Sequence, residues 1–253
     1  MRISVFLTAL FLVTTTLATA QTAATANTPW EYSGNRGALN WGKLDPAYKT
    51  CSQGDQQSPI DIRGAHLNKA LQPIEFHYIT GSVTLENDGH TIVVHVNPGS
   101  YIIAGGVRYE LQQYDFHHPT EHAVQGKLTE MDVHLLHKSA DGKVAIIAVR
   151  LVEDRDKPNA VLAMLWPHLP TTAGKTTKVT EMVNAGGLLP SDRGYWTYMG
   201  SLTRPPCTEG VRWFVFENEI TLGREQLRAF TAIFKMNSRP LQGMHGRRIE
   251  ANE

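Results

Sequence analysis

Two stretches decide the fold: Gln113-Tyr114-Asp115-Phe116-His117 and, a little further along, Met131-Asp132-Val133-His134-Leu135-Leu136-His137. Apolar and polar residues alternate in both, which is typical of strands with two different faces. Side chains two positions apart share a face, so Asp115 and His117 point the same way. If the two strands are neighbours, we expect His134 to join them.

Two imidazoles and one carboxylate form one of the sets that hold catalytic zinc and leave a fourth position open. Asp132 precedes His134 by two positions and is placed to accept a hydrogen bond from its second ring nitrogen, while Gln113 is placed to hold Asp115. The alternative is a group of hydrogen-bonded polar residues in a partly buried sheet. Local spacing does not decide between the two.

Short runs rich in β-branched and aromatic residues surround these stretches, and turn sequences such as Asp141-Gly142 separate them. The runs are Ile74–Ile79, Thr91–Val96, Tyr101–Ile103, Gln112–His117, Met131–His137, Val144–Val152 and Val211–Glu217. This spacing predicts a mainly β fold. Helical spacing is confined to Asn159–Trp166 and Arg224–Phe234, and Trp30–Asp61 has the composition of an ordered loop. With no internal repeat, we expect a single domain.

The N-terminus has the order of a secretory signal peptide. Met1-Arg2 is basic, Ile3–Leu17 carries no charge, and small residues follow at Ala18–Ala20 and Ala24–Ala26. We expect a signal peptide over residues 1–20, with cleavage after Ala20 or after Ala26. The alternative, a membrane anchor, needs about 20 apolar residues, and this run is shorter. The expected protein is periplasmic or secreted, with no membrane span after signal removal.

Charge and cysteine content narrow the class further. The 24 basic and 24 acidic residues cancel, which argues against nucleic acid as a partner. An even pair of cysteines in an exported chain favours a disulfide between Cys51 and Cys207 over two buried thiols.

Longer motifs add a resemblance. Gln56-Gln57-Ser58-Pro59-Ile60-Asp61-Ile62 and Tyr195-Trp196-Thr197-Tyr198-Met199-Gly200-Ser201-Leu202-Thr203 are similar to signature segments of the α-carbonic anhydrases. Asn87–His90, Gln113–His122, Met131–Lys138 and Asn237–Pro240 resemble further segments of that family in the same order. The resemblance runs from Trp30 to about Arg247, and we expect the α-carbonic anhydrase domain at residues 30–250.

The resemblance implies the fold, the reaction and the cofactor. The fold would have a large central twisted, mostly antiparallel sheet with a few short peripheral helices. The reaction would be reversible hydration of carbon dioxide to bicarbonate and a proton, which makes the protein a carbonate dehydratase (a zinc lyase) that requires Zn2+. The substrate is a small molecule, and a homodimer is left open.

The resemblance also implies roles for individual residues. Asp115, His117 and His134 would be the metal ligands, and Thr203 with Glu121 would orient the attacking hydroxide. His90 would carry protons to solvent, Tyr32 would order water, and Gln113, Asp132 and His122 would lie behind the ligands. The substrate pocket would be formed by Leu136, Ile146, Leu202, Val211, Trp213 and Arg204.

Three positions depart from the family pattern. Asp115 stands where the family has its first histidine ligand, Arg204 replaces a small hydroxyl residue, and Val93 replaces a polar one. In one interpretation Asp115 ligates zinc and the activity is reduced. In the other the chain is a catalytically silent, carbonic-anhydrase-like binding domain. The remaining site residues favour the enzyme.

Overall fold

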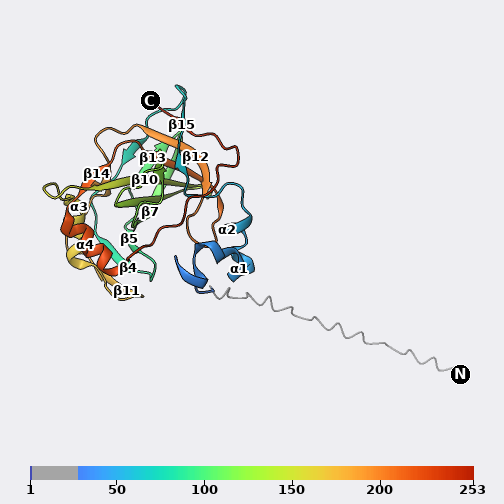
Figure 1. Cartoon of the computed structure of the whole chain (residues 1–253), viewed down its shortest axis with the longest axis horizontal. Helices are drawn as coiled ribbons and strands as arrows, with labels where there is room; N and C mark the ends of the chain where they lie inside the picture. The colour runs from blue at the N-terminus through green and yellow to red at the C-terminus, as the bar shows by residue number, and fades with distance from the viewer. Residues whose placement is uncertain (2–27) are drawn as a thin grey trace.

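The computed structural model describes Met1 and residues 28–253, so the expected signal peptide falls, apart from Met1, outside the described residues (Figure 1). Among the described residues, no helix has both the length and the apolar character needed to cross a membrane.

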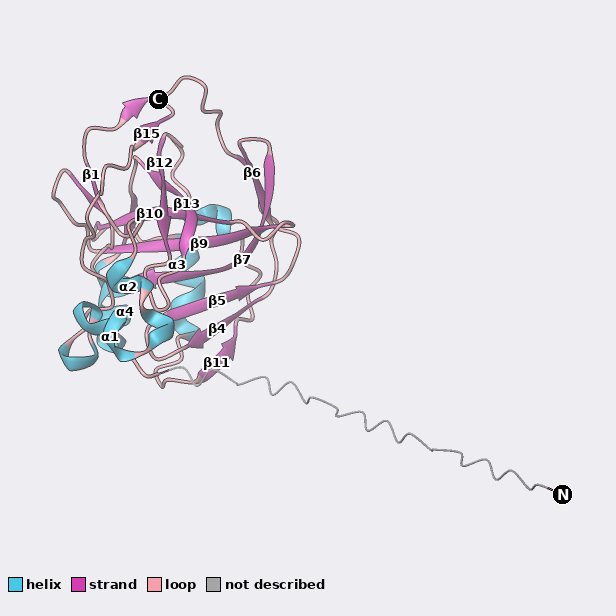
Figure 2. Cartoon of the chain, turned by 90° about the vertical axis from the view of Figure 1, so that its right-hand side faces the viewer, coloured by secondary structure: helices cyan, strands magenta, loops and turns pink. Residues whose placement is uncertain are grey.

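A large mixed sheet forms the centre of the molecule. Within residues 28–253 it contains 13 strands, hydrogen-bonded in the order β11-β4-β5-β7-β9-β10-β13-β12-β15-β2, with β14 beside β10 and β6 joining β3 to β7. Figure 2 shows β11, β4, β5, β7, β9 and β10 stacked in this order. Only the β10–β13, β10–β14 and β15–β2 pairs of this described sheet are parallel, which confirms the expected mostly antiparallel sheet.

The strands have the following bounds: β1 Asp61–Ile62, β2 His66–Leu67, β3 Glu75–His77, β4 Val83–Asn87, β5 Ile92–Val96, β6 Tyr101–Ala104, β7 Val107–His117, β8 Ala123–Val124, β9 Met131–Ser139, β10 Val144–Glu153, β11 Lys175–Lys178, β12 Tyr195–Ser201, β13 Glu209–Phe216, β14 Ile220–Leu222 and β15 Glu250–Ala251. β1 and β8 pair separately as a small parallel sheet. All seven predicted runs contain strands. The other eight strands of the described chain were not predicted, because they are short or mix polar and apolar residues: β1, β2, β4, β8, β11, β12, β14 and β15.

A β-bulge in β7 decides which residues face which side. Leu111 pairs with His137 and Gln113 pairs with Leu136, so Gln112 is the extra residue. An extra residue reverses the alternation of side chains. Leu111 and Tyr114, three positions apart, therefore both lie in the large core, and Asp115 is left on the opposite face.

Each face of the sheet carries its own apolar core. The larger one packs beneath α3 (Ala160–Leu165) and α4 (Arg224–Ile233), whose Leu162 and Phe230 are fully buried. Figure 1 shows both helices on the same side of the sheet. The second core lies on the other face and centres on Trp213. The two predicted helices are thus confirmed, with ends shifted by one residue.

The segment Trp30–Asp61 was predicted as loop, and this is partly wrong. It contains α1 (Trp41–Leu44), α2 (Thr50–Gln53) and three 3₁₀ turns at Gly34–Arg36, Ala38–Asn40 and Pro46–Tyr48. Each turn is too short to produce an apolar periodicity. Further 3₁₀ turns lie at Trp166–His168 and Ala185–Leu188. Trp41 and Tyr48 form a third small core with the cysteine pair, so tertiary packing holds these turns.

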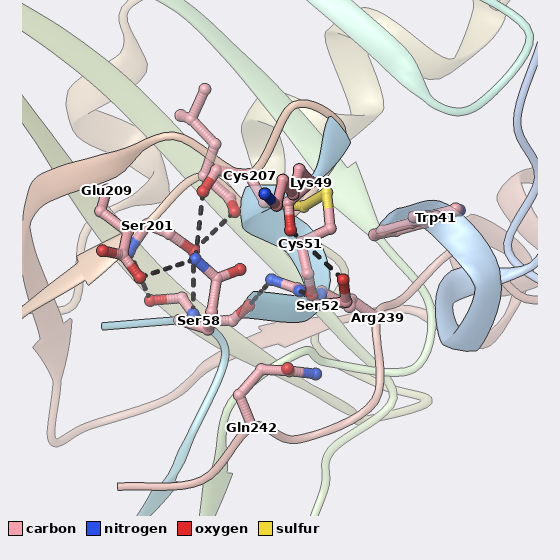
Figure 3. The surroundings of a disulfide bond; sticks show 12 residues. Trp41, Lys49, Cys51, Ser52, Ser58, Ser201, Cys207, Glu209, Arg239 and Gln242 are labelled. Atoms are coloured by element: carbon pink, nitrogen blue, oxygen red, sulfur yellow. Dashed lines mark hydrogen bonds between the residues drawn. A yellow bond between two sulfur atoms is a disulfide. The ribbon is translucent and has the colours of Figure 1, made fainter. Parts of the chain in front are cut away.

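The Cys51–Cys207 disulfide is present, as expected, with Cα atoms 5.0 Å apart. It joins α2 to the segment between β12 and β13 (Figure 3). Gln57 donates a hydrogen bond to the Cys207 carbonyl across 3.1 Å, which fixes the same segment a second time. This segment carries Thr203 and Arg204.

Candidate metal centre

The three candidate ligands meet where β7 pairs with β9. Asp115 lies directly opposite His134, and His117 lies opposite Asp132. One ligand atom from each of Asp115, His117 and His134 lies within 4.8 Å of the others, and the two imidazole centroids are 4.5 Å apart. All three residues are buried. The strand register therefore produces the group that the alternation predicted.

A second group, His122, Asp132 and His134, has similar spacing, but its atoms are already engaged. Asp132 Oδ2 accepts hydrogen bonds from the Thr120 hydroxyl and the Glu121 backbone N–H, at 2.9 and 2.8 Å. His122 Nε2 is bonded to the Tyr198 hydroxyl at 2.7 Å. The group with Asp115 is the better candidate because, among the described residues, no hydrogen bond engages the Asp115 carboxylate, His117 Nε2 or His134 Nδ1.

Asp132 lies behind both histidines. Its Oδ2 is hydrogen-bonded to His134 Nε2 at 3.2 Å. Its Oδ1 lies 3.2 Å from His117 Nδ1, although neither of these two atoms has a hydrogen-bond partner among the described residues. The other ring nitrogens, His117 Nε2 and His134 Nδ1, lie 4.0 and 3.7 Å from Glu121 Oε2. Burial favours the neutral acid, but the adjacent imidazoles hold the pKa of Asp132 well below its usual range. A carboxylate behind ligating imidazoles fixes their tautomer and orientation.

Negative charge gathers around this pair of rings. Burial alone would lower the pKa of His117, but Glu121, Asp132 and Asp115 outweigh it and raise the pKa to about 9. A site that stabilises a buried cation this strongly suits a divalent metal ion. Together with the two imidazoles and the carboxylate, this makes the residues a fit for zinc.

Glu121 lies beside the candidate ligands and is buried. Its Oε1 accepts a hydrogen bond from the Arg239 backbone N–H at 2.8 Å, while Oε2 has no hydrogen-bond partner among the described residues. Oε2 lies 3.7 Å from His134 Nδ1. Burial raises the pKa of Glu121, and the neighbouring imidazoles and the Thr203 side chain partly counteract this.

An apolar surface adjoins the metal centre. The expected pocket residues Leu136, Ile146, Leu202, Val211 and Trp213 all belong to the second core, in which Leu136 and Leu202 are only partly buried. The Trp213 ring lies 4.9 Å from the His134 ring, edge to face. The metal centre and the apolar surface therefore share one face of the sheet.

Comparison with known proteins is consistent with this arrangement. Residues 36–253 match the family model for eukaryotic-type carbonic anhydrase. The chain belongs to this carbonic anhydrase family. It is 41% identical over 221 residues to a carbonic anhydrase from Klebsiella pneumoniae, covering 86% of this chain and 89% of the relative.

Solved structures of carbonic anhydrases have the same fold. The α-carbonic anhydrase from Thermovibrio ammonificans, solved with the inhibitor sulfanilamide, has a TM-score of 0.85 and 36% identity, covering 88% of this chain and 99% of that one. A hyperthermostable carbonic anhydrase from a hydrothermal vent chimney has a TM-score of 0.85 and 41% identity, covering 89% and 100%.

Three expected site residues lie near the carbonic anhydrase centre with differing contacts. Gln113 shares a face with Asp115, yet the described residues show no hydrogen bond between them. The Tyr32 hydroxyl is buried and unpaired among the described residues, and burial raises its pKa well above the usual value. His122 is buried against Trp213, and burial lowers its pKa to about 3, so it is neutral.

His90 lies on the turn between β4 and β5. Asp88 Oδ1 accepts hydrogen bonds from the backbone N–H groups of His90 and Thr91, both at 2.8 Å. The His90 ring stacks on Trp30 and donates through Nε2 to the Trp30 carbonyl at 3.0 Å. Trp30 therefore holds the His90 ring by stacking and by one hydrogen bond.

Three residues for which the sequence indicated no role connect the segments of the site: Asp88, Asn237 and Arg239. Asn237 donates hydrogen bonds to the His90 and Phe116 carbonyls. Buried Arg239 donates to the Ser58 and Cys51 carbonyls at 2.7 and 2.8 Å (Figure 3). The motif Asn237-Ser238-Arg239-Pro240 was the available signal, but its partners are distant in sequence.

Proposed function

We propose that this chain catalyses the reversible hydration of carbon dioxide to bicarbonate and a proton, with Zn2+ held by Asp115, His117 and His134. The observation that carries the proposal is the convergence of these three ligand atoms within 4.8 Å, directly beside the unpaired Oε2 of Glu121. Membership of the carbonic anhydrase family supports the reaction.

Zinc at this position would act as a Lewis acid and make water nucleophilic near neutral pH. Asp132 orients the two imidazoles so that their free nitrogens face the ion. Glu121 Oε2 is buried and has no hydrogen bond among the described residues, so it is free to accept a hydrogen bond from the Thr203 hydroxyl. Because the Thr203 hydroxyl would donate its proton to Glu121, its oxygen could only accept a hydrogen bond from the nucleophile. This would fix the direction of attack.

Carbon dioxide is small and apolar, so an apolar surface suffices to hold it. Leu136 and Leu202, which are only partly buried, provide that surface over the buried Trp213 ring beside His134. The proton released in each cycle must reach solvent, and an imidazole titrates in the required range. His90 does this once its ring leaves the Trp30 carbonyl.

The location is a second part of the proposal. The disulfide is of the kind that persists in oxidising compartments. Together with the signal-like N-terminus, this supports export to the periplasm or the medium after removal of residues 1–20.

Stopped-flow measurement of carbon dioxide hydration tests the function. We expect catalysis by the zinc-loaded chain, its loss on chelation, its return with zinc, and inhibition by sulfanilamide. Thr203→Val should bind zinc normally but lower kcat/KM on the order of 100-fold, because it removes a single oriented hydrogen bond. Hydration at the uncatalysed rate with zinc bound would contradict the proposal and favour the silent binding domain.

A further inference from the structure

Two departures from the family pattern touch each other. Arg204 Nη2 lies 3.5 Å from Asp115 Oδ2, and Arg204 Nη1 donates a hydrogen bond to Asp88 Oδ2 at 2.9 Å. Asp115 replaces a neutral histidine and adds one negative charge, whereas Arg204 replaces a small hydroxyl residue and adds one positive charge. The two substitutions therefore leave the net charge of the site unchanged.

The main chain holds Arg204 firmly. It follows Thr203 in the segment that the Cys51–Cys207 disulfide joins to α2. Its carbonyl accepts a hydrogen bond from the Cys207 backbone N–H at 2.9 Å. A side chain with a fixed base can hold a partner in one geometry, which a mobile surface arginine cannot.

Asp88 fixes the guanidinium from the other side. Asp88 Oδ2 accepts the hydrogen bond from Arg204 Nη1. Asp88 Oδ1 accepts a hydrogen bond from the His90 backbone N–H and so holds the turn that carries His90. An arginine is always charged in proteins, and the Arg204 guanidinium lies between the carboxylates of Asp88 and Asp115.

The two distances indicate how Asp115 is held. At 2.9 Å Arg204 is anchored to Asp88, while at 3.5 Å it only attracts Asp115. Asp115 Oδ1 makes no hydrogen bond among the described residues and remains available to an ion. Polar groups behind a ligating carboxylate orient it, and here the expected partner, Gln113, makes no such contact.

We propose that Arg204 is a positioning residue for Asp115 that also offsets its extra charge, so that an aspartate can serve where the family has a histidine. This inference rests on the proposed zinc site. It makes Arg204 favourable for zinc binding only while residue 115 is an aspartate. Beside a neutral ligand, the same guanidinium would only repel the ion.

A four-member cycle tests the inference: the parent chain, Arg204→Thr, Asp115→His, and the double variant. The readout is the zinc dissociation constant, measured by competition with a chromophoric chelator. Arg204→Thr should weaken zinc binding at least 10-fold in the parent. In the Asp115→His background the same substitution should leave the affinity unchanged or raise it.

Two further variants separate the effect of charge from that of geometry and provide a control. Arg204→Lys retains the charge but cannot span both carboxylates, so its affinity should lie between those of the parent and Arg204→Thr. Arg224→Thr, a matched control, removes an arginine bonded to Glu153 at 2.6 Å on α4, and should leave zinc affinity unchanged.

The outcomes separate the two proposals. A parent chain that binds no zinc contradicts the proposed function and, with it, the role of Arg204. A parent chain that binds zinc, with Arg204→Thr having the same effect in both backgrounds, contradicts only the role of Arg204.

Discussion

The imidazole of His90 lies flat on the indole of Trp30, with ring centroids 3.6 Å apart and an interplanar angle of 10°. Asp88 holds the His90 backbone, and Nε2 donates to the Trp30 carbonyl, so the ring is engaged with Trp30 rather than with the candidate metal ligands. We propose that His90 carries protons from the site.

His90→Ala should therefore slow hydration on the order of 100-fold in weakly buffered solution, because proton export becomes limiting. The measurement is stopped-flow hydration with and without added imidazole, which should restore much of the loss. A rate that is unchanged at low buffer concentration would remove His90 from the mechanism.

Asp132→Asn should weaken zinc binding by about 10- to 100-fold, since it removes the carboxylate charge that lies 3.2 Å from both imidazoles. Chelator competition measures the change. Asp141→Asn is the matched control, because Asp141 lies on the exposed turn between β9 and β10. Equal zinc affinities for the two variants would show that Asp132 does not position the ligands.

Replacing both Cys51 and Cys207 by serine should lower the free energy of unfolding by about 2–5 kcal/mol, as expected for a native disulfide closing a long loop. The loop spans 156 positions. Urea denaturation measures the stability. We also expect lower activity, because the segment carrying Thr203 and Arg204 loses its link to α2. A double variant as stable as the parent would mean that the core alone holds this segment.

His137 makes stability depend on pH. Burial lowers its pKa to about 3, against about 6.5 in an unfolded chain. Between these values the unfolded state binds the extra proton, so stability is full above about pH 6.5 and falls as the pH is lowered towards 3. One such group contributes a slope of up to about 1.4 kcal/mol per pH unit.

His137→Gln, which keeps a polar partner for the Tyr78 hydroxyl, should flatten that dependence. Urea denaturation between pH 4 and pH 7 compares the two chains. Identical slopes for the parent and His137→Gln would contradict the prediction.

Alternation along β7 was enough to predict that Asp115 and His117 share a face, because it depends only on strand geometry. That His134 joins them required β7 and β9 to be neighbours, and local spacing did not decide between a metal site and hydrogen-bonded polar residues. The alternation does not extend before Gln113, where the bulge reverses it. No local pattern marks that bulge. The register that places Asp115 opposite His134 became visible only in the folded sheet.

The connections around the site were beyond prediction for a related reason. Arg239 bonds to carbonyls 181 and 188 positions away, and Arg204 reaches Asp88 across 116 positions. The sequence showed that Asp115 and Arg204 are both unusual for the family. It did not show that they touch, which is what turns two separate departures into one compensated pair.

The central claim is that Asp115 completes a zinc site with His117 and His134. The most direct test is the zinc content of the purified mature chain after equilibrium dialysis, compared with Asp115→Ala and Asp115→His. We expect close to one zinc per chain for the parent and for Asp115→His, and a large loss for Asp115→Ala. No zinc in the parent, with one zinc recovered in Asp115→His, would contradict it.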